Sequence, residues 1–191
     1  PDMTHIPEDY CGAPDPTNPN SAYGEGKRVA ELLCSLYSKK FGIEAKIARC
    51  FAFVGPYLPL DIHYAIGNFI RDGLNGGPIV VKGDGTPYRS YLYAADLAIW
   101  LWTILFKGES CSPYNVGSEE GITIAELANM VEQCFEGPVE IQIAQKPDPN
   151  HLLERYVPST KLSRETLALK KVIQLTDGIK RTALCPLFVN Q

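Results

Sequence analysis

The sequence predicts an α/β fold in which strands and helices alternate and the sheet is largely parallel. Three observations support this prediction. A helical pattern over about residues 21–42 is followed directly by an apolar run over residues 43–54 that is typical of a buried strand. Glycine and proline clusters, as at 55–56 and 76–78, then separate the later apolar runs. Finally, short strand-like runs and helical patterns keep alternating to the end of the chain.

The first regular element is predicted to be a helix of about twenty residues. Before it, residues 1–20 are rich in proline and have no apolar periodicity, so we expect a surface loop there. Asn20 or Ser21 can cap the helix at its start, and Gly42 can end it. Apolar residues recur at helical spacing between these ends, which predicts a helix with an apolar face.

The later elements follow from the same periodicities and from the turns between them. We expect strands at 43–54, 79–81, 91–93, 114–116 and 139–143, and helices at 66–74, 94–106, 123–135, 161–168 and 176–183. Asp96 stands at the start of an apolar helix, and we assign it a structural role such as capping.

Composition argues against several functional classes. The chain of 191 residues is 45% hydrophobic, which is enough for a real core. A formal net charge of −4 gives no long-range attraction for nucleic acid. The longest apolar run, 97–106, is about half as long as a membrane-spanning helix, so no membrane segment is expected. Six cysteines and three scattered histidines lack metal-ligand spacing, so we expect reduced thiols, no metal site and a cytoplasmic protein.

The first residues, Pro1-Asp2-Met3-Thr4, do not have the pattern of a signal peptide. Because position 1 is not Met, we expect the chain to begin in the middle of a longer protein.

Tyr23 and Lys27 form the strongest local signal for chemistry. Residues four apart near the start of a helix project from one face, about one turn apart. A nearby ammonium stabilises a phenolate, so Lys27 would make Tyr23 a usable proton shuttle for a sugar hydroxyl. On spacing alone, the pair is also compatible with an ordinary exposed helical face.

The residues around this pair resemble a known family. The stretch 18–31, Asn-Pro-Asn-Ser-Ala-Tyr-Gly-Glu-Gly-Lys-Arg-Val-Ala-Glu, resembles the catalytic helix of extended short-chain dehydrogenases that act on nucleotide sugars, such as UDP-glucuronate decarboxylases and dTDP-glucose 4,6-dehydratases. Two features besides the Tyr and Lys match the family, namely the Pro-x-Ser entry and the glycines around an acidic residue. By this resemblance Tyr23 and Lys27 are catalytic and bind the cofactor, NAD, with NADP not excluded.

The following segment, 49–56, resembles the strand-to-turn motif Arg-x-Phe-Asn-x-Tyr-Gly-Pro of the same family. Here Ala52 replaces the usual Asn, and Val54 replaces the usual Tyr. In the family that Asn contacts the substrate. Its loss removes an amide with two donors and an acceptor, so we expect other residues to orient the sugar.

Later segments reproduce, in order, the family's substrate-site elements. The substrate-binding residues that the resemblance implies are Asn68, Phe69, Val80, Arg89 and Arg155. The resemblance assigns Asn68 to the diphosphate, the strand 79–81 to the base, and Arg89 to the phosphates. Arginine suits this last role because its guanidinium can bind two phosphate oxygens at once. For Arg89 a solvated surface ion pair is the alternative, since an isolated arginine in a turn is usually solvated. Arg155 resembles the family's second arginine, which contacts the nucleotide.

The resemblance implies the C-terminal part of a Rossmann-type parallel sheet plus a small α/β substrate-binding domain. Residues 1–56 are expected to form the catalytic-helix half of the NAD-binding domain, with 84–107 returning to it. Residues 57–83 and 108–191 are expected to form the nucleotide-sugar domain. No Gly-x-x-Gly-x-x-Gly follows a strand and opens a helix, so the half that holds the dinucleotide fingerprint is expected to be absent.

The function implied is that of a fragment of an NAD-dependent enzyme, which oxidises a nucleotide-diphosphate sugar transiently at C4 and then epimerises, dehydrates or decarboxylates it. We expect the isolated chain to be inactive and the full-length protein to be a homodimer, as is common in the family. The departures at Ala52 and Val54 motivate an alternative, a non-catalytic module that binds nucleotide sugars. The base, the sugar and the final reaction remain open.

Overall fold

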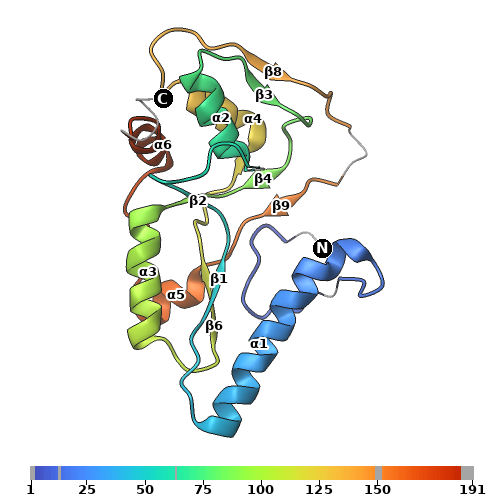
Figure 1. The fold of residues 1–191 in the computed structure, drawn as a ribbon, viewed down its shortest axis with the longest axis vertical. Coiled ribbons are helices and arrows are strands. Elements are labelled where there is room, and N and C mark those ends of the chain that lie inside the picture. The colour runs from blue at the N-terminus through green and yellow to red at the C-terminus, as the bar shows by residue number, and fades with distance from the viewer. Residues whose placement is uncertain (1–2, 13, 63, 149–151, 186–191) are drawn as a thin grey trace.

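The computed structural model describes residues 3–12, 14–62, 64–148 and 152–185. Its elements fall into two groups (Figure 1). The lower group surrounds a central pair of strands, and the upper group is a layer of helices beside short strands. Each group has a separate hydrophobic core.

The lower group is built on two parallel strands, β1 (Ile47–Cys50) and β6 (Pro113–Val116), which pair residue for residue along their length. The helices α3 (Ala94–Lys107) and α5 (Lys161–Leu167) lie on one side of this pair, and α1 (Ala22–Phe41) lies on the other (Figure 1). The core between the strands and α3 consists of Leu92, Trp100, Ile104, Tyr114, Val116 and Leu169.

The upper group packs three helices around a second parallel pair of strands. The strands β3 (Ile79–Val81) and β8 (Ile141–Ile143) pair in parallel. The helices α2 (Ala65–Leu74), α4 (Ile124–Glu132) and α6 (Leu175–Ala183) contact one another, and α2 and α4 contact β3. Thr123 and Glu126 form a reciprocal capping box at the start of α4, which satisfies two backbone donors that a helix start leaves unpaired.

Very short strands join the two groups. β2 (Phe53–Val54) pairs in parallel with β5 (Leu92–Tyr93). A separate three-stranded sheet has β4 (Tyr88–Arg89) at its centre, with β7 (Ile122–Thr123) antiparallel on one side and β9 (Arg155–Tyr156) parallel on the other. This sheet brings residues near position 89 beside residues near position 155.

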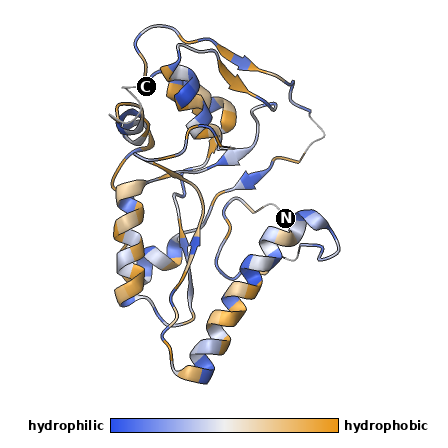
Figure 2. Ribbon diagram, in the orientation of Figure 1, coloured by the Kyte–Doolittle hydropathy of each residue, from blue (hydrophilic) through white to orange (hydrophobic). Residues whose placement is uncertain are grey.

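Helix α1 follows a single 3-10 turn, η1 (Pro19–Ser21), and contains no buried residue. Apolar side chains nevertheless line it, and Figure 2 shows their orange bands along the helix. Besides Tyr23, the exposed large ones are Val29, Leu32, Leu33, Leu36, Tyr37 and Phe41. Burial therefore contributes little to holding α1 against the rest of the chain, and specific polar contacts matter more.

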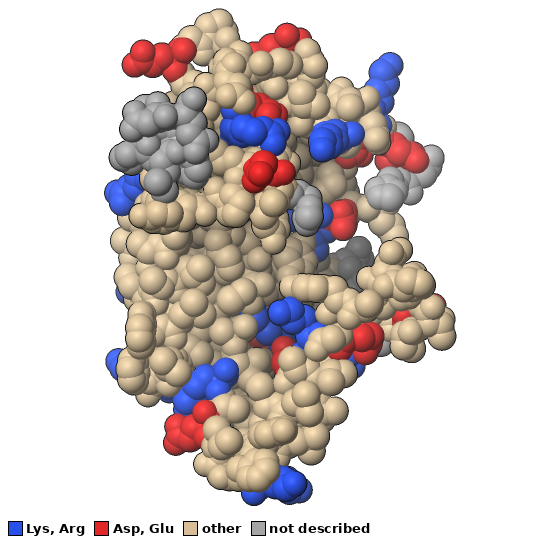
Figure 3. Space-filling model, viewed as in Figure 1, with Lys and Arg blue, Asp and Glu red and all other residues tan. Residues whose placement is uncertain are grey.

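A second apolar surface lies on the outer face of α3. Ile99, Trp102 and Phe106 are 57%, 61% and 75% exposed, and the last two rings stack with centroids 5.6 Å apart. Figure 3 shows that the face over α3 carries few charged side chains, whereas acidic and basic groups lie side by side in the upper half. This helix is apolar on both its inner and outer faces.

The structure confirms the predicted α/β class with parallel strand pairing. The long first helix is also confirmed, and it ends at Gly42, whose left-handed φ of 67° suits glycine. Ser21 makes no side-chain cap bond, and Asn18 caps the preceding 3-10 turn instead. The predicted strand 43–54 is divided into β1 and β2. The strands β4, β7 and β9 were not predicted, because two-residue strands carry no periodicity.

The strand β6, which lies within the range assigned to the nucleotide-sugar domain, pairs with β1 from the range assigned to the NAD-binding domain. The division of the chain into these two domains stays a proposal. Asp96 is 2% exposed and does have a structural role, but it does not cap its own helix. Its carboxylate accepts hydrogen bonds from the backbone N–H groups of Val172 (3.1 Å) and Ile173 (2.9 Å). Within the described ranges, no helix is long and apolar enough to cross a membrane.

Candidate functional site

Tyr23 and Lys27 lie on one face in the first turns of α1. The Lys27 Nζ atom stands 5.3 Å from the centroid of the Tyr23 ring, in a cation–π contact. Tyr23 is 78% exposed. The two side chains are therefore adjacent and open to a ligand, as the spacing predicted.

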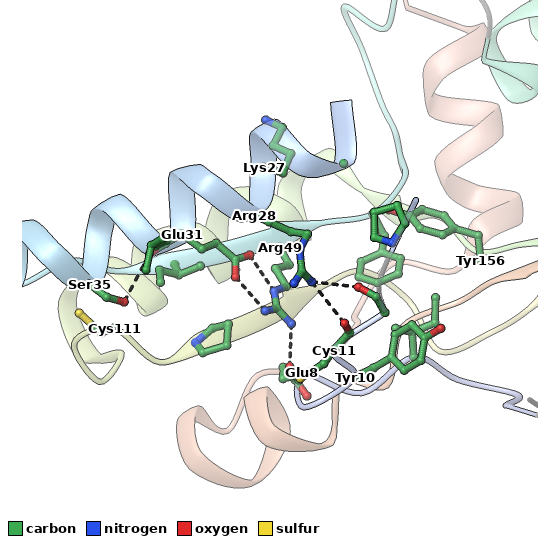
Figure 4. Close-up of a pocket in the computed structure, with 18 residues that line it drawn as sticks. Glu8, Tyr10, Cys11, Lys27, Arg28, Glu31, Ser35, Arg49, Cys111 and Tyr156 are labelled. Carbon is green, nitrogen blue, oxygen red and sulfur yellow. Dashed lines mark hydrogen bonds and ion pairs between the residues drawn. The ribbon is translucent and has the colours of Figure 1, made fainter. Parts of the chain in front are cut away.

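Two grooves run along the flanks of α1. One, of about 820 Å³, lies between α1 and the N-terminal loop and is drawn in Figure 4. The other, of about 560 Å³, is lined by Tyr23, Lys27, Cys50, Phe51 and Tyr156 among others. Burial raises the pKa of the Cys50 thiol, and the charge of Lys27 opposes that shift, so the ammonium acts on the wall of this groove.

A charged pair fastens α1 to the sheet at the first groove. Arg49, from β1, donates from Nε and Nη2 to the two carboxylate oxygens of Glu31 on α1, each at 2.8 Å (Figure 4). It also donates from Nη1 to the Glu8 carbonyl at 2.7 Å. The hydrogen bonds to Glu31 raise the pKa of Arg49. Arg28 holds the N-terminal loop by donating to the carbonyls of Cys11 and Gly12.

A third cavity, of about 550 Å³, lies in the upper group between α2, β3 and β4. Four of the five predicted substrate residues line it: Asn68, Phe69, Val80 and Arg89. The cavity wall also includes three basic side chains and one acidic side chain, namely Arg71, Lys82, Arg89 and Asp72. This excess of positive charge suits an anionic ligand such as a diphosphate.

The orientation of the Asn68 amide is fixed by Arg71. Arg71 donates from Nη1 to the Asn68 Oδ1 atom at 3.1 Å, and because a guanidinium can only donate, the NH₂ group of Asn68 is left to offer hydrogen bonds to a ligand. Arg71 is itself held by Asp72 at 2.7 Å. The second oxygen of Asp72 accepts from the Val80 N–H at 3.3 Å, which ties β3 to α2 across the cavity wall.

Arg89 is 27% exposed along its side chain and already has a protein partner. Its Nη2 lies 3.0 Å from a carboxylate oxygen of Glu154, and its Nη1 donates to the Tyr88 carbonyl at 2.9 Å. Glu154 is 64% exposed, so the pair is weak and a bound phosphate can displace the carboxylate at small cost.

Arg155 is not among the described residues that line this cavity. Its guanidinium carbon lies 3.6 Å from the centroid of the Tyr88 ring, over its face. Tyr88 and Arg155 are register partners, so both side chains lie on the face of β4 and β9 opposite to Arg89. The predicted contact between Arg155 and the nucleotide stays a prediction.

The two positions at which the sequence departs from the family motif have structural surroundings that suit apolar residues. Val54 is 1% exposed and belongs to the upper core. Ala52 packs partly buried against the same core. Among the residues described, no group of three or more His, Cys, Asp or Glu side chains could hold a metal ion.

Sequence reasoning missed several residues of these sites: Arg71, Asp72 and Lys82 in the cavity, Glu154 beside Arg89, and Tyr156 in the grooves along α1. Arg71 and Asp72 directly follow the segment that resembles the family, and one helical turn separates Asn68 from Arg71, a spacing that could have indicated their contact. Nothing in the local sequence could have shown that Tyr156 lies near α1.

Comparison with known proteins shows which family the chain belongs to. The model of the NAD dependent epimerase/dehydratase family matches residues 1–117. The chain belongs to this family. It is 34% identical over 173 residues to UDP-glucuronic acid decarboxylase 5 of Arabidopsis thaliana, covering 91% of this chain and 50% of the relative. It is 32% identical over 175 residues to UDP-glucuronic acid decarboxylase 1 of Danio rerio, covering 92% of this chain and 41% of the relative.

Solved structures agree at the level of the fold. UDP-glucuronic acid 4-epimerase from Bacillus cereus, in complex with NAD, matches with a TM-score of 0.74 and 24% identity, covering 94% of this chain and 53% of its own. dTDP-glucose 4,6-dehydratase from Bacillus anthracis, also in complex with NAD, matches with a TM-score of 0.75 and 20% identity, covering 96% and 56%. The chain thus spans about half the length of the relatives that it matches.

Proposed function

We propose that this chain is the nucleotide-sugar-binding part of an NAD-dependent epimerase, dehydratase or decarboxylase. The observation that supports this most directly is the cavity of about 550 Å³, in which Asn68, Arg71, Lys82 and Arg89 place hydrogen-bond donors around an opening of suitable size. The diphosphate of the ligand would accept from Asn68 and Arg89. The apolar side chain of Val80, which lines the same cavity, would pack against the base.

In this proposal Tyr23 and Lys27 carry out the proton transfer. The Tyr23 phenol would take the proton of a sugar hydroxyl and later return it, and the ammonium of Lys27 would stabilise the phenolate between the two steps. Their adjacency at 5.3 Å and their open exposure support these roles. The Lys27 ammonium would also hydrogen-bond the ribose of the cofactor.

The chain offers only part of a dinucleotide site. Tyr23 and Lys27 fit the nicotinamide end, because both line an open groove. The glycine motif that would hold the pyrophosphate at a helix start does not occur in the sequence. NAD, when bound, would supply the acceptor for a hydride from the sugar. We therefore expect that the chain alone does not reduce NAD in the presence of a nucleotide sugar, and formation of NADH by this chain would contradict that expectation.

A second function, binding of nucleotide sugars without catalysis, has one observation in its favour. The described chain forms a cavity at Asn68 and Arg89, whereas the dinucleotide fingerprint does not occur in the sequence. Tyr23→Phe distinguishes the two proposals when the substitution is made in a full-length protein that contains this chain. Loss of turnover with unchanged ligand affinity supports catalysis, and a binding module would lose nothing on this change.

The binding proposal is tested by calorimetric titration of the chain with UDP-, dTDP-, GDP- and CDP-sugars. We expect at least one of them to bind, and Arg89→Gln to weaken that binding about tenfold or more, because a charge-assisted hydrogen bond contributes about 1.5–3 kcal/mol. Arg164→Gln is the matched control, since Arg164 is also paired with a glutamate but lies outside the cavity. Absence of binding, or equal losses in both variants, would overturn the proposal.

A further inference from the structure

Tyr156 stands between the cavity at Arg89 and the Tyr23–Lys27 pair. In the parallel pairing of β4 with β9, Arg89 and Tyr156 are register partners. Side chains at paired positions of neighbouring strands project from the same face of the sheet. The phenol of Tyr156 therefore lies on the side to which Arg89 points, while Tyr88 and Arg155 stack on the opposite side.

The ring of Tyr156 is fixed, while its hydroxyl is available to a ligand. The ring stacks on Phe51, with centroids 4.7 Å apart and planes 30° apart. The residue is 43% exposed and lines both grooves along α1, together with Lys27. Among the described residues, the hydroxyl has no hydrogen-bond partner (Figure 4 shows the side chain at the end of the groove). A rigid ring with an unused donor and acceptor is suited to recognising a polar ligand.

Electrostatics connects Tyr156 with both sites. Burial raises the pKa of its phenol, the Tyr23 phenol raises it further, and Arg89 lowers it. The geometry places Tyr156 beside both sites, because it lines one groove with Tyr23 and Lys27 and is the register partner of Arg89. The order across the surface is thus Arg89, Tyr156, Tyr23 and Lys27.

A nucleotide sugar that spans these groups would place its sugar at Tyr156. The phosphates would lie at Arg89, the reacting hydroxyl would lie at Tyr23, and the sugar ring connects the two. The methyl side chain of Ala52 carries no donor or acceptor, unlike the Asn that the family motif has at this position, so it cannot hydrogen-bond the ring hydroxyls.

We propose that Tyr156 is a specificity-determining residue, whose hydroxyl hydrogen-bonds the sugar of a bound nucleotide sugar and orients it between Arg89 and Tyr23. This inference rests on the proposed function, because it takes the ligand to be a nucleotide sugar. It differs from the assignments made by resemblance, since it adds a contact to the sugar ring and not to the diphosphate or base.

The test compares Tyr156→Phe with the unchanged chain for two ligands, UDP-glucuronate and UDP. Phenylalanine keeps the stacking on Phe51 and removes only the hydroxyl. We expect the affinity for UDP-glucuronate to fall about fivefold, the effect of one neutral hydrogen bond, and the affinity for UDP to stay unchanged. Tyr37→Phe is the control, because Tyr37 is a similarly exposed tyrosine on α1 whose ring contacts that of Phe41 in a tilted arrangement away from these sites, and it should change neither affinity.

The outcomes separate this inference from the function on which it depends. If the chain binds UDP but Tyr156→Phe leaves both affinities unchanged, or lowers both equally, the role of Tyr156 is overturned and the nucleotide site stands. If the unchanged chain binds neither ligand, both proposals fall. Circular dichroism of each variant, with an unchanged melting transition, ensures that a loss of affinity is not a loss of fold.

Discussion

The attachment of α1 to the sheet gives the sharpest quantitative prediction. This helix carries Tyr23 and Lys27 but buries none of its residues, so the bidentate pair between Glu31 and Arg49 is expected to dominate its local stability. We predict that Glu31→Gln increases the local opening of α1. Glutamine removes the negative charge and one of the two acceptors while keeping nearly the same shape.

The magnitude follows from the geometry of the pair. Both hydrogen bonds are 2.8 Å long and charge-assisted, and the side chains of Arg49 and Glu31 are 32% and 31% exposed. Such a pair lies between exposed ion pairs, worth about 0.2–1 kcal/mol, and buried pairs, whose disruption costs about 3–5 kcal/mol. We expect Glu31→Gln to cost about 1.5 kcal/mol, which corresponds to roughly a tenfold loss of protection from hydrogen exchange in α1.

Hydrogen exchange followed by mass spectrometry measures this loss in peptides that cover α1. Glu25→Gln is the matched control on the same helix, because the Glu25 carboxylate lies 3.8 Å from Arg28, in a longer and more exposed pair than that of Glu31. It should change protection by less than about twofold. Equal protection in the unchanged chain and Glu31→Gln, or equal losses in the two variants, would refute the reasoning that this pair holds the helix.

Three further changes have expected outcomes. Glu154→Gln removes the carboxylate that competes for Arg89, so the affinity for UDP should rise about threefold in calorimetry, an effect that high salt should reduce. Gly55→Ala would place a Cβ 2.4 Å from the Ala94 Cβ, and this overpacking should lower the free energy of unfolding in urea by about 2 kcal/mol. Burial raises the pKa of Tyr91 to about 12, so its phenol should ionise last in a spectrophotometric titration. Since the unfolded phenol ionises near about pH 10, stability should fall as pH rises from there towards 12, and Tyr91→Phe should weaken that dependence.

The regular helices could be predicted from the sequence because their signals are local. Periodicity and Gly42 defined α1, and the apolar run after Tyr93 defined α3. The cavity residues Asn68, Val80 and Arg89 could be named by resemblance, and the structure brings them together at one opening.

What the sequence could not predict depends on pairing between distant segments. β4 and β9 are two residues long, so no pattern indicates that Arg89 and Tyr156 become partners. The same register turns Arg155 towards Tyr88, a direction that a motif cannot specify. The contact between Arg49 and Glu31 likewise joins a strand to a helix, and only the packing of the chain determines which charged groups meet.

We propose that the cavity between α2, β3 and β4 binds the nucleotide diphosphate. An NMR titration of the isotopically labelled chain with UDP can show whether the ligand binds there. We predict the largest shift changes at the side-chain NH₂ of Asn68 and at backbone amides from Val80 to Arg89. Shift changes centred on the grooves along α1, or none at saturating UDP, would contradict the claim.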